Sequence, residues 1–380
     1  MKTNKIHWKV FGLILVASVF MFQSCSEAPV NPKNVKQLDT KSLLKSTPQV
    51  SLADFVLKTG NIITKKFFPP YIHAAELYYE LPTTLVIDIR SKEEYKQGHI
   101  DGSYNVPRDQ ILKFLETKVH PEAYKKIVIV DKYGPVGIYA ATLLRFYGYD
   151  NAYGLKFGIG AWNRKFANNI EKYLSNKYAS KLDTVNTPKP QAGVLPITAK
   201  QPYKKILKSQ VEKCLALPDS QIFVNVDDVF GNSDKYFKIA YWSEPKYNNG
   251  HIPGSIRYNT RSDLSVDKEL NTLPVDKKIV VYCNTGHHAI ATVAYLKLLG
   301  YDARSIMYGA NSFMNQKFAT DFPGSGITDV SLITAELPLV TGEKRSNKKQ
   351  IKATASAVKV AAPVIPVHKK KKQAAAGGCE

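Results

Sequence analysis

The sequence is poor in cysteine, and its few cysteines are not spaced as metal ligands. The 380 residues include only four of them, namely Cys25, Cys214, Cys283 and Cys379. No Cys-x-x-Cys pair occurs, and no cysteines and histidines follow the spacing of a zinc site. The sequence therefore predicts neither a structural metal nor a cofactor. An amphipathic helical stretch surrounds Cys214, which favours a core position for that residue.

The N-terminal region lacks a hydrophobic run long enough to cross a membrane. Its apolar stretch, Val10 to Phe22, is shorter than the roughly 20 residues that a spanning helix needs. Basic residues precede this stretch and Ser24-Cys25 follows it, an order that resembles a bacterial lipoprotein signal. We predict that residues 1–25 are a signal peptide and that Cys25 becomes the lipidated N-terminus. The protein would then be a membrane-anchored lipoprotein of the bacterial cell envelope, outside the cytoplasm. Ordinary signal cleavage nearby, with Cys25 lost or unmodified, is the alternative.

Acidic residues are also scarce. There are 32 Asp and Glu against 53 Lys and Arg, which gives a formal net charge of +21. Part of this excess lies in the C-terminal segment, residues 323–380, whose end is rich in Ala, Lys, Val and Pro without any helical or strand period. We predict a disordered basic tail there. Because no aromatic residues alternate with its basic ones, we predict no nucleic-acid partner. Anionic lipid headgroups, or no partner at all, are the alternatives for this charge. The terminal Gly377-Gly378-Cys379 is either incidental or an arm that carries sulfur.

Cys283 lies where a buried strand gives way to a helix. The run Ile279–Tyr282 is β-branched and aromatic, which predicts a strand that ends at the cysteine. Residues 289–299 precede a glycine and predict a helix. The short loop between them contains Gly286, and its backbone N–H groups would lie beside the sulfur at a helix N-terminus. Such donors lower the pKa of a thiol and bind anions. A buried structural cysteine is the alternative, but the loop favours a nucleophile.

The chain also repeats itself. Gly98-His99-Ile100 recurs as Gly250-His251-Ile252, and Gly148-Tyr149-Asp150 recurs as Gly300-Tyr301-Asp302. Both pairs are separated by the same offset, which indicates two copies of one domain. The same offset places Asp131 opposite Cys283. Because a carboxylate cannot act as a sulfur nucleophile, we predict that the first copy is inactive. We predict that His99 and His251 hold a loop by hydrogen bonding.

Together these motifs resemble the rhodanese (sulfurtransferase) family. The resemblance rests on Asp88-Ile89-Arg90, on Glu94-Tyr95, on the two Gly-His-Ile-x-Gly motifs and on the Cys-x-x-Gly loop before a helix. It implies an α/β fold with two tandem rhodanese-like domains, each a parallel sheet flanked by helices. Alternating short strands and helices indicate the same class. It also implies an inactive first and an active second domain, with the site near their interface.

The predicted organisation follows from these matches and from the composition between them. Residues 26–70 would be a tether and entry segment, and residues 71–172 the inactive domain. A proline-containing linker, residues 173–204, would lead to the active domain at residues 205–322.

Three departures from the family pattern concern anion binding. His288 stands where many active members carry an arginine, so its charge would depend on pH near 6.5. In the second copy, Asn225-Val226-Asp227 is taken as the counterpart of Asp88-Ile89-Arg90. About fifteen extra residues would then precede the second Gly-His-Ile motif. That insertion resembles one whose arginine binds thiosulfate in long tandem members, and Lys235 is the nearest basic residue in it.

These features predict a sulfurtransferase that acts through a Cys283 persulfide. A thiosulfate-like donor would deliver sulfane sulfur, and a thiol or cyanide would accept it. The predicted donor-binding residues are the loop and one lysine, namely Asn284, Thr285, Gly286, His287, His288, Ala289 and Lys235. A membrane-tethered, non-catalytic sulfur carrier or an anion- or protein-binding module is the alternative. Phosphatase chemistry is disfavoured, because it normally needs the arginine that His288 replaces.

Overall fold

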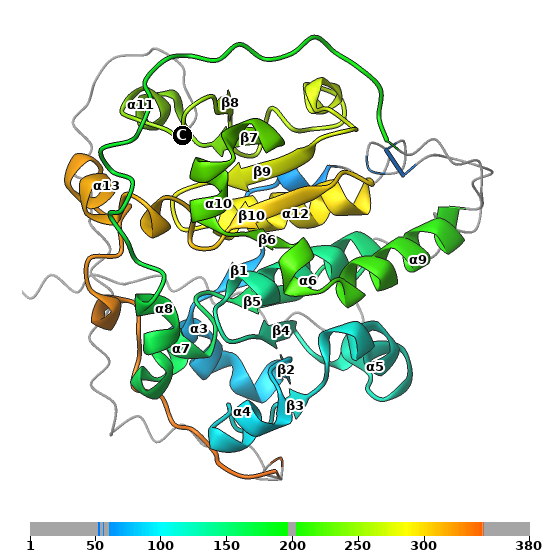
Figure 1. Ribbon diagram of the computed structural model, residues 1–380. Helices are drawn as coiled ribbons and strands as arrows, with labels where there is room; N and C mark the ends of the chain where they lie inside the picture. The colour runs from blue at the N-terminus through cyan, green and yellow to red at the C-terminus, as the bar shows by residue number, and fades with distance from the viewer. Residues whose placement is uncertain (1–51, 54–55, 57–60, 197–202, 344, 346–380) are drawn as a thin grey trace, which may run out of the picture. The chain divides into compact units, whose positions relative to one another are not determined.

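A computed structural model describes residues 52–53, 56, 61–196, 203–343 and 345 of the chain (Figure 1). The lipidation site at Cys25, the basic tail beyond residue 345 and Cys379 lie outside these residues. Those predictions therefore stay predictions. Within the described part, no helix is both long and apolar enough to cross a membrane.

The first domain is built on a five-stranded parallel sheet in the order β1-β5-β4-β2-β3. Its central strands consist mainly of β-branched and other apolar residues, and almost all of them are buried, as expected for a sheet covered on both faces. The strands are β1 (Tyr71–Ile72), β2 (Thr84–Asp88), β3 (Tyr104–Asn105), β4 (Lys126–Val130) and β5 (Ala152–Leu155).

The second domain repeats this arrangement. Its sheet has the order β6-β10-β9-β7-β8, and every pair is again parallel. The strands are β6 (Phe223–Val224), β7 (Tyr236–Tyr241), β8 (Ile256–Tyr258), β9 (Lys278–Tyr282) and β10 (Ala303–Ile306). The predicted α/β class and the two tandem domains are thus confirmed.

Helices connect the strands in both domains. In the first they are α3 (Ala74–Glu80), α4 (Lys92–Gln97), α5 (Ile111–Thr117), α6 (Pro135–Tyr147), α7 (Ile159–Trp162) and α8 (Asn168–Glu171). In the second they are α9 (Tyr203–Ala216), α10 (Val226–Gly231), α11 (Glu244–Asn248), α12 (His287–Leu298) and α13 (Asn315–Asp321).

Helices α6 and α12, each of which follows a central strand, pack against one another. Their rings Phe146 and Tyr295 stack with centroids 5.7 Å apart. Every residue of α12 except His288 is buried, so this helix forms the shared core of both domains. The predicted core position of Cys214 on α9 is also confirmed, because 2% of its surface is exposed.

The strand orders correct one alignment made from the sequence. By sheet position, β7 is the counterpart of β2 and the edge strand β6 is the counterpart of β1. The partners of Asp88 and Arg90 are therefore Ala240 and Trp242, and the assignment to Asn225-Val226-Asp227 is wrong. Asn225 instead caps α10, since its side chain accepts a hydrogen bond from the N–H of Asp227. With strands aligned in this way, no insertion precedes the second Gly-His-Ile motif.

In the first domain the Asp88–Arg90 pair is intact. The two side chains form a buried salt bridge of 2.5 Å, and Arg90 also donates to the carbonyl of Gly98 at 2.8 Å. In the second domain an aromatic residue, Trp242, stacks on Phe318 in the corresponding place, with centroids 5.6 Å apart. The second domain thus replaces a charged clamp with apolar packing.

The two motif histidines hold their loops, as predicted. Nδ1 of His99 lies 2.9 Å from the carbonyl oxygen of Tyr95, and the two rings stack. His251 makes the same contacts with Tyr247, at 2.8 Å.

Two segments outside the sheets lie against the domains. Part of the predicted linker runs along the second domain, where Asp183 pairs with His251 and Lys189 bridges Asp263 and Glu269. The start of the C-terminal segment packs on the first domain instead. There Val340 pairs with His99, and the indole N–H of Trp162 donates to the carbonyl of Pro338.

Candidate active site

Cys283 follows β9 directly and precedes α12, as the sequence predicts. The loop between them turns at Gly286, whose φ of +79° lies in the left-handed region that favours glycine. The carbonyl of Cys283 accepts a hydrogen bond from the N–H of Ala310 at 2.8 Å, which fixes the end of the strand. Only 4% of the cysteine surface is exposed. The sulfur therefore lies under the loop that surrounds it.

The predicted backbone donors are present around the thiol, but they do not determine the direction in which its pKa shifts. Burial raises the pKa of Cys283, and the N–H groups of Thr285, Gly286, His288 and Ala289 oppose that shift. The expected lowering of this pKa is therefore wrong for the structure as described. The physical reason is desolvation, which penalises a thiolate more than these donors stabilise it.

The remaining loop residues hold the cradle in shape. The carbonyl of Asn284 accepts a hydrogen bond from the Asn311 side chain at 2.7 Å, which ties the loop to the next turn. The Thr285 hydroxyl lies 2.9 Å from Nδ1 of His287.

His287 faces the first domain. Its ring is 1% exposed and contacts the rings of Phe157 and Tyr71, with centroids 4.7 Å and 5.8 Å away. Its Nε2 atom is buried and has no hydrogen-bond partner within the described part of the chain. Burial, followed by the charge of Lys156, holds the pKa of His287 well below the usual histidine range. The imidazole is therefore neutral near pH 7.

His288 is partly exposed at the same helix start. Burial lowers its pKa to about 4, and the nearby positive charges of Arg261, Lys156 and Lys246 act in the same direction. Titration of His288 near pH 6.5, as predicted from its type alone, is therefore wrong. A neutral imidazole cannot replace the guanidinium that many family members carry at this position.

The structure does not bring Lys235 to this site. Lys235 precedes β7, and the parallel register pairs Tyr236 with Lys278, the first residue of β9. Cys283 follows the last residue of β9, so the two lie at opposite ends of the sheet. The assignment of Lys235 to donor binding is wrong because it depended on an insertion that is absent.

A different basic residue, Arg261, lies at the same edge of the sheet as the cysteine. It follows β8 and has a φ of +57°. Its backbone N–H donates to the hydroxyl of Tyr241 at 2.8 Å, and Tyr241 ends β7. The charge of Arg261 acts on His288 and on Tyr71, and Cys283 also acts on Tyr71. Sequence reasoning missed Arg261, although carboxyl ends of parallel strands converge at one sheet edge and could have indicated it.

The equivalent position in the first domain holds a carboxylate in the same kind of cradle. Asp131 is 3% exposed, and it accepts hydrogen bonds from the N–H groups of Tyr133, Gly134 and Val136 at 3.2, 2.8 and 3.2 Å. Burial raises its pKa to about 6, against the effect of these donors. The Asp131 carboxylate thus takes the place that the Cys283 thiol has in the second domain.

We expect the stability of the protein to fall as pH rises, through Asp131. Its pKa is about 6 when folded, against 3.8 for the model carboxyl. A group with a raised folded pKa contributes stability below its unfolded pKa, and that contribution is lost as pH rises to the folded value. The difference corresponds to about 3 kcal/mol between pH 4 and 7. The free energy of unfolding in urea should fall across this range by about that amount more in the wild type than in Asp131→Asn. The control variant Asp109→Asn, at an exposed carboxyl, should show the same fall as the wild type. Parallel curves for the wild type and Asp131→Asn would contradict the assignment.

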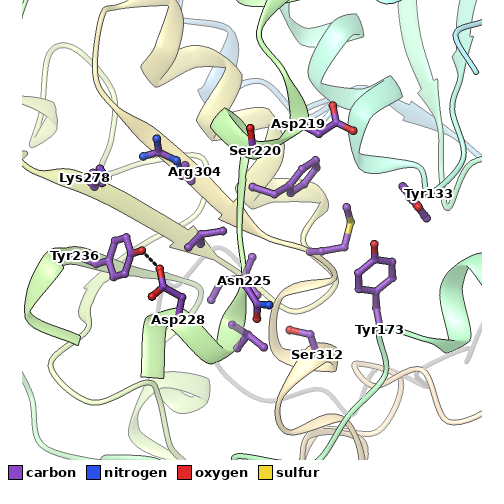
Figure 2. Close-up of a pocket in the computed structure, with 15 residues that line it drawn as sticks. Tyr133, Tyr173, Asp219, Ser220, Asn225, Asp228, Tyr236, Lys278, Arg304 and Ser312 are labelled. Carbon is purple, nitrogen blue, oxygen red and sulfur yellow. Dashed lines mark hydrogen bonds between the residues drawn. The ribbon is translucent and has the colours of Figure 1, made fainter. Parts of the chain in front are cut away.

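Two cavities lie near these loops, and Cys283 lines neither. One, of about 740 Å³, runs along the β6 edge and is lined by Tyr133, Tyr173, Phe223 and Arg304, among others. Figure 2 shows this cavity, with the hydroxyl of Tyr236 directed at Asp228. The other, of about 460 Å³, borders Asp131.

No group of three or more His, Cys, Asp or Glu side chains within the described ranges could hold a metal ion. The chemistry that the arrangement offers is nucleophilic, from a single thiol beside backbone donors and cationic side chains.

Comparisons with known proteins agree on one family. The model of the rhodanese-like domain matches residues 73–165 and 241–316. A protein named thiosulfate sulfurtransferase GlpE from Pseudoalteromonas translucida is 30% identical over 88 residues, which cover 23% of this chain and 81% of that protein. Its namesake from Shewanella oneidensis is 29% identical over 84 residues, 22% of this chain and 80% of that protein.

Solved structures are similar at lower identity. A thiosulfate sulfurtransferase from Pseudomonas aeruginosa is 14% identical, with 72% of this chain and 67% of that chain covered and a TM-score of 0.23. A structure described as a probable thiosulfate sulfurtransferase is 16% identical, with 62% and 95% covered and a TM-score of 0.27.

Proposed function

Because this chain belongs to the rhodanese family, we propose that it is a sulfurtransferase whose nucleophile is Cys283. It moves sulfane sulfur from a thiosulfate-like donor to a thiol or cyanide acceptor through a persulfide on this residue. The observation that carries the proposal is the sulfur itself, held at the start of α12 and facing four backbone N–H groups. The first domain has Asp131 in the same place. Mass measurement after thiosulfate treatment tests the proposal.

The reaction proceeds in two displacements. The thiol of Cys283 releases its proton to solvent, and the thiolate attacks the outer sulfur of the donor. A new sulfur–sulfur bond forms while the donor's own sulfur–sulfur bond breaks, and sulfite leaves with the bonding electron pair. The acceptor then attacks the outer sulfur of the persulfide and regenerates the Cys283 thiolate. Loop N–H groups stabilise the anionic sulfur in both steps.

Arg261 supplies positive charge to the donor in this scheme. Its guanidinium acts electrostatically on His288 and Tyr71, which flank the cysteine. The hydrogen bond from its N–H to Tyr241 fixes the backbone that carries it. A positive charge at this point stabilises both the anionic donor and the thiolate.

We expect Arg261→Gln to raise the KM for thiosulfate about tenfold, since it removes a charge-assisted contact. Steady-state turnover of thiosulfate with cyanide measures this effect. Lys235→Gln is the matched control, because Lys235 lies at the opposite end of the sheet, and its KM should equal that of the wild type. A rise in KM for Lys235→Gln with none for Arg261→Gln would contradict this placement.

A sulfur carrier that turns over slowly is the second candidate. The burial of Cys283 and the raised pKa of its thiol favour it, because a closed, protonated thiol reacts slowly. Persulfide formation that persists while turnover with cyanide or a thiol is negligible would support the carrier over the enzyme.

We also propose that the protein is anchored to the bacterial cell envelope through a lipid on Cys25. The support comes from the basic, apolar and small residues that precede this cysteine. Mass analysis of the N-terminal peptide from a membrane fraction tests it.

A further inference from the structure

Lys156 of the first domain lies against Tyr71, whose ring contacts His287 at the start of α12. It directly follows β5, and its backbone N–H donates to the carbonyl of Ile72 at 2.9 Å. The next residue, Phe157, has a φ of +62°, so the chain turns sharply here. The turn places the lysine ammonium over the rings of Tyr71 and Phe157, 4.8 Å and 5.5 Å from their centroids.

The charge of Lys156 is not neutralised by a neighbour. Burial alone lowers the pKa of this lysine, and within the described part of the chain no carboxylate forms an ion pair with it. A desolvated ammonium without a counter-ion is costly for a folded protein. Such a group is already positioned to bind an anion, because its desolvation has occurred before the ligand arrives.

The positive charge of Lys156 acts on the residues that begin α12. It lowers the pKa of both His287 and His288, and Arg261 acts on His288 from the second domain. The unpartnered Nε2 of His287 is buried. When the Thr285 hydroxyl donates to Nδ1, the neutral ring carries its proton on Nε2 and offers it to a ligand.

Tyr71 connects this lysine to the cysteine. Its ring lies beneath the Lys156 ammonium and beside His287. The ionised forms of its phenol and of Cys283 would repel one another, and Arg261 acts on the same phenol. Two cations from different domains, Lys156 and Arg261, therefore act on the residues around one cysteine.

We propose that Lys156 is a donor-binding residue of the Cys283 site, so that the first domain, without a nucleophile of its own, selects donors with two negative charges. This inference rests on the proposed function, because the donor is the substrate of Cys283. Thiosulfate carries two charges and leaves as the sulfite dianion, whereas an organic thiosulfonate carries one. Arg261 and Lys156 together balance the two negative charges of thiosulfate, and Arg261 alone balances the single charge of a thiosulfonate.

Lys172 provides a matched control in the same domain. Its ammonium also lies over two aromatic rings, 5.0 Å from the centroid of Tyr133 and 5.2 Å from that of Tyr173. The main charges that act on His287 and His288 do not include it. Loss of cation–aromatic packing is therefore common to Lys172→Met and Lys156→Met, while loss of charge at the site is not.

The test compares KM and kcat for thiosulfate and for methanethiosulfonate, a monoanion. Lys156→Met should raise the KM for thiosulfate about tenfold and that for methanethiosulfonate at most about threefold, with kcat nearly unchanged. Lys156→Arg should stay near the wild type, and so should Lys172→Met. An equal rise for both donors, or none for either, would overturn charge selection by Lys156.

Thiosulfate binding to Cys283→Ser, measured by calorimetry, separates this inference from the proposed function. If adding Lys156→Met weakens that binding about tenfold, the inference stands, whether or not the wild type forms a persulfide. If the binding is unchanged or absent, the inference fails, and persulfide formation by the wild type would still support the proposed function.

Discussion

Cys283→Ser should lower the rate of sulfur transfer by at least about a thousandfold, because a hydroxyl cannot form the persulfide. Wild-type protein treated with thiosulfate should gain the mass of one sulfur atom, and the variant should gain none. The loop N–H groups and Arg261 remain in the variant, so thiosulfate should still bind. This separation of binding from chemistry is what a nucleophile at the start of α12 requires.

Cys214→Ala is the control for this experiment. Cys214 is buried in the core, and burial raises the pKa of its thiol to about 11, so it stays protonated. Its removal should leave persulfide formation unchanged. Full turnover by Cys283→Ser, or loss of the added sulfur in Cys214→Ala alone, would show that the persulfide does not form on Cys283.

The fold was predictable because its determinants are local and repeated. The β-branched runs before Asp131 and Cys283 form the central strands β4 and β9, and the glycines after the following helices end them. The constant offset between the copies was enough to pair Asp131 with Cys283. The same offset pairs Asp88 and Arg90 with Ala240 and Trp242, but it was not followed there, because those two residues share no chemistry with an acid and a base. A sequence match cannot follow a position whose charge has been exchanged for apolar packing.

The site was predictable only where it is contiguous. The loop from Cys283 to Ala289 was found because its residues are neighbours in the chain. Arg261 and Lys156, which we propose bind the donor, were missed because they follow other strands, and only the parallel sheets and the contact between domains bring them to the residues around the cysteine. The direction of the Cys283 pKa shift depends on burial, which the loop sequence does not specify.

Gly309→Ala should damage both the stability and the activity of the second domain. Gly309 has a φ of +53°, and a Cβ atom there would lie 2.0 Å from the carbonyl oxygen of Cys283 and 3.0 Å from the nitrogen of Gly286. Both contacts are with backbone, which cannot move aside as a flexible side chain can. The carbonyl of Cys283 also accepts the N–H of Ala310, so the methyl group would separate the two loops that enclose the sulfur. We expect a loss of about 3 kcal/mol or more in the free energy of unfolding.

Gly324→Ala separates this effect from the general cost of a left-handed conformation. Gly324 has a φ of +86°, but a Cβ atom there would meet nothing within 4 Å. Its substitution should therefore cost only about 1 kcal/mol. Urea unfolding of both variants measures the difference, and persulfide formation by the folded fraction shows whether the cradle survives. Similar losses for the two glycines would mean that the loops can separate without harm. The turn at Gly309 would then not be needed to hold Cys283. The larger loss expected for Gly309→Ala would instead show that this close backbone contact holds the cysteine in place.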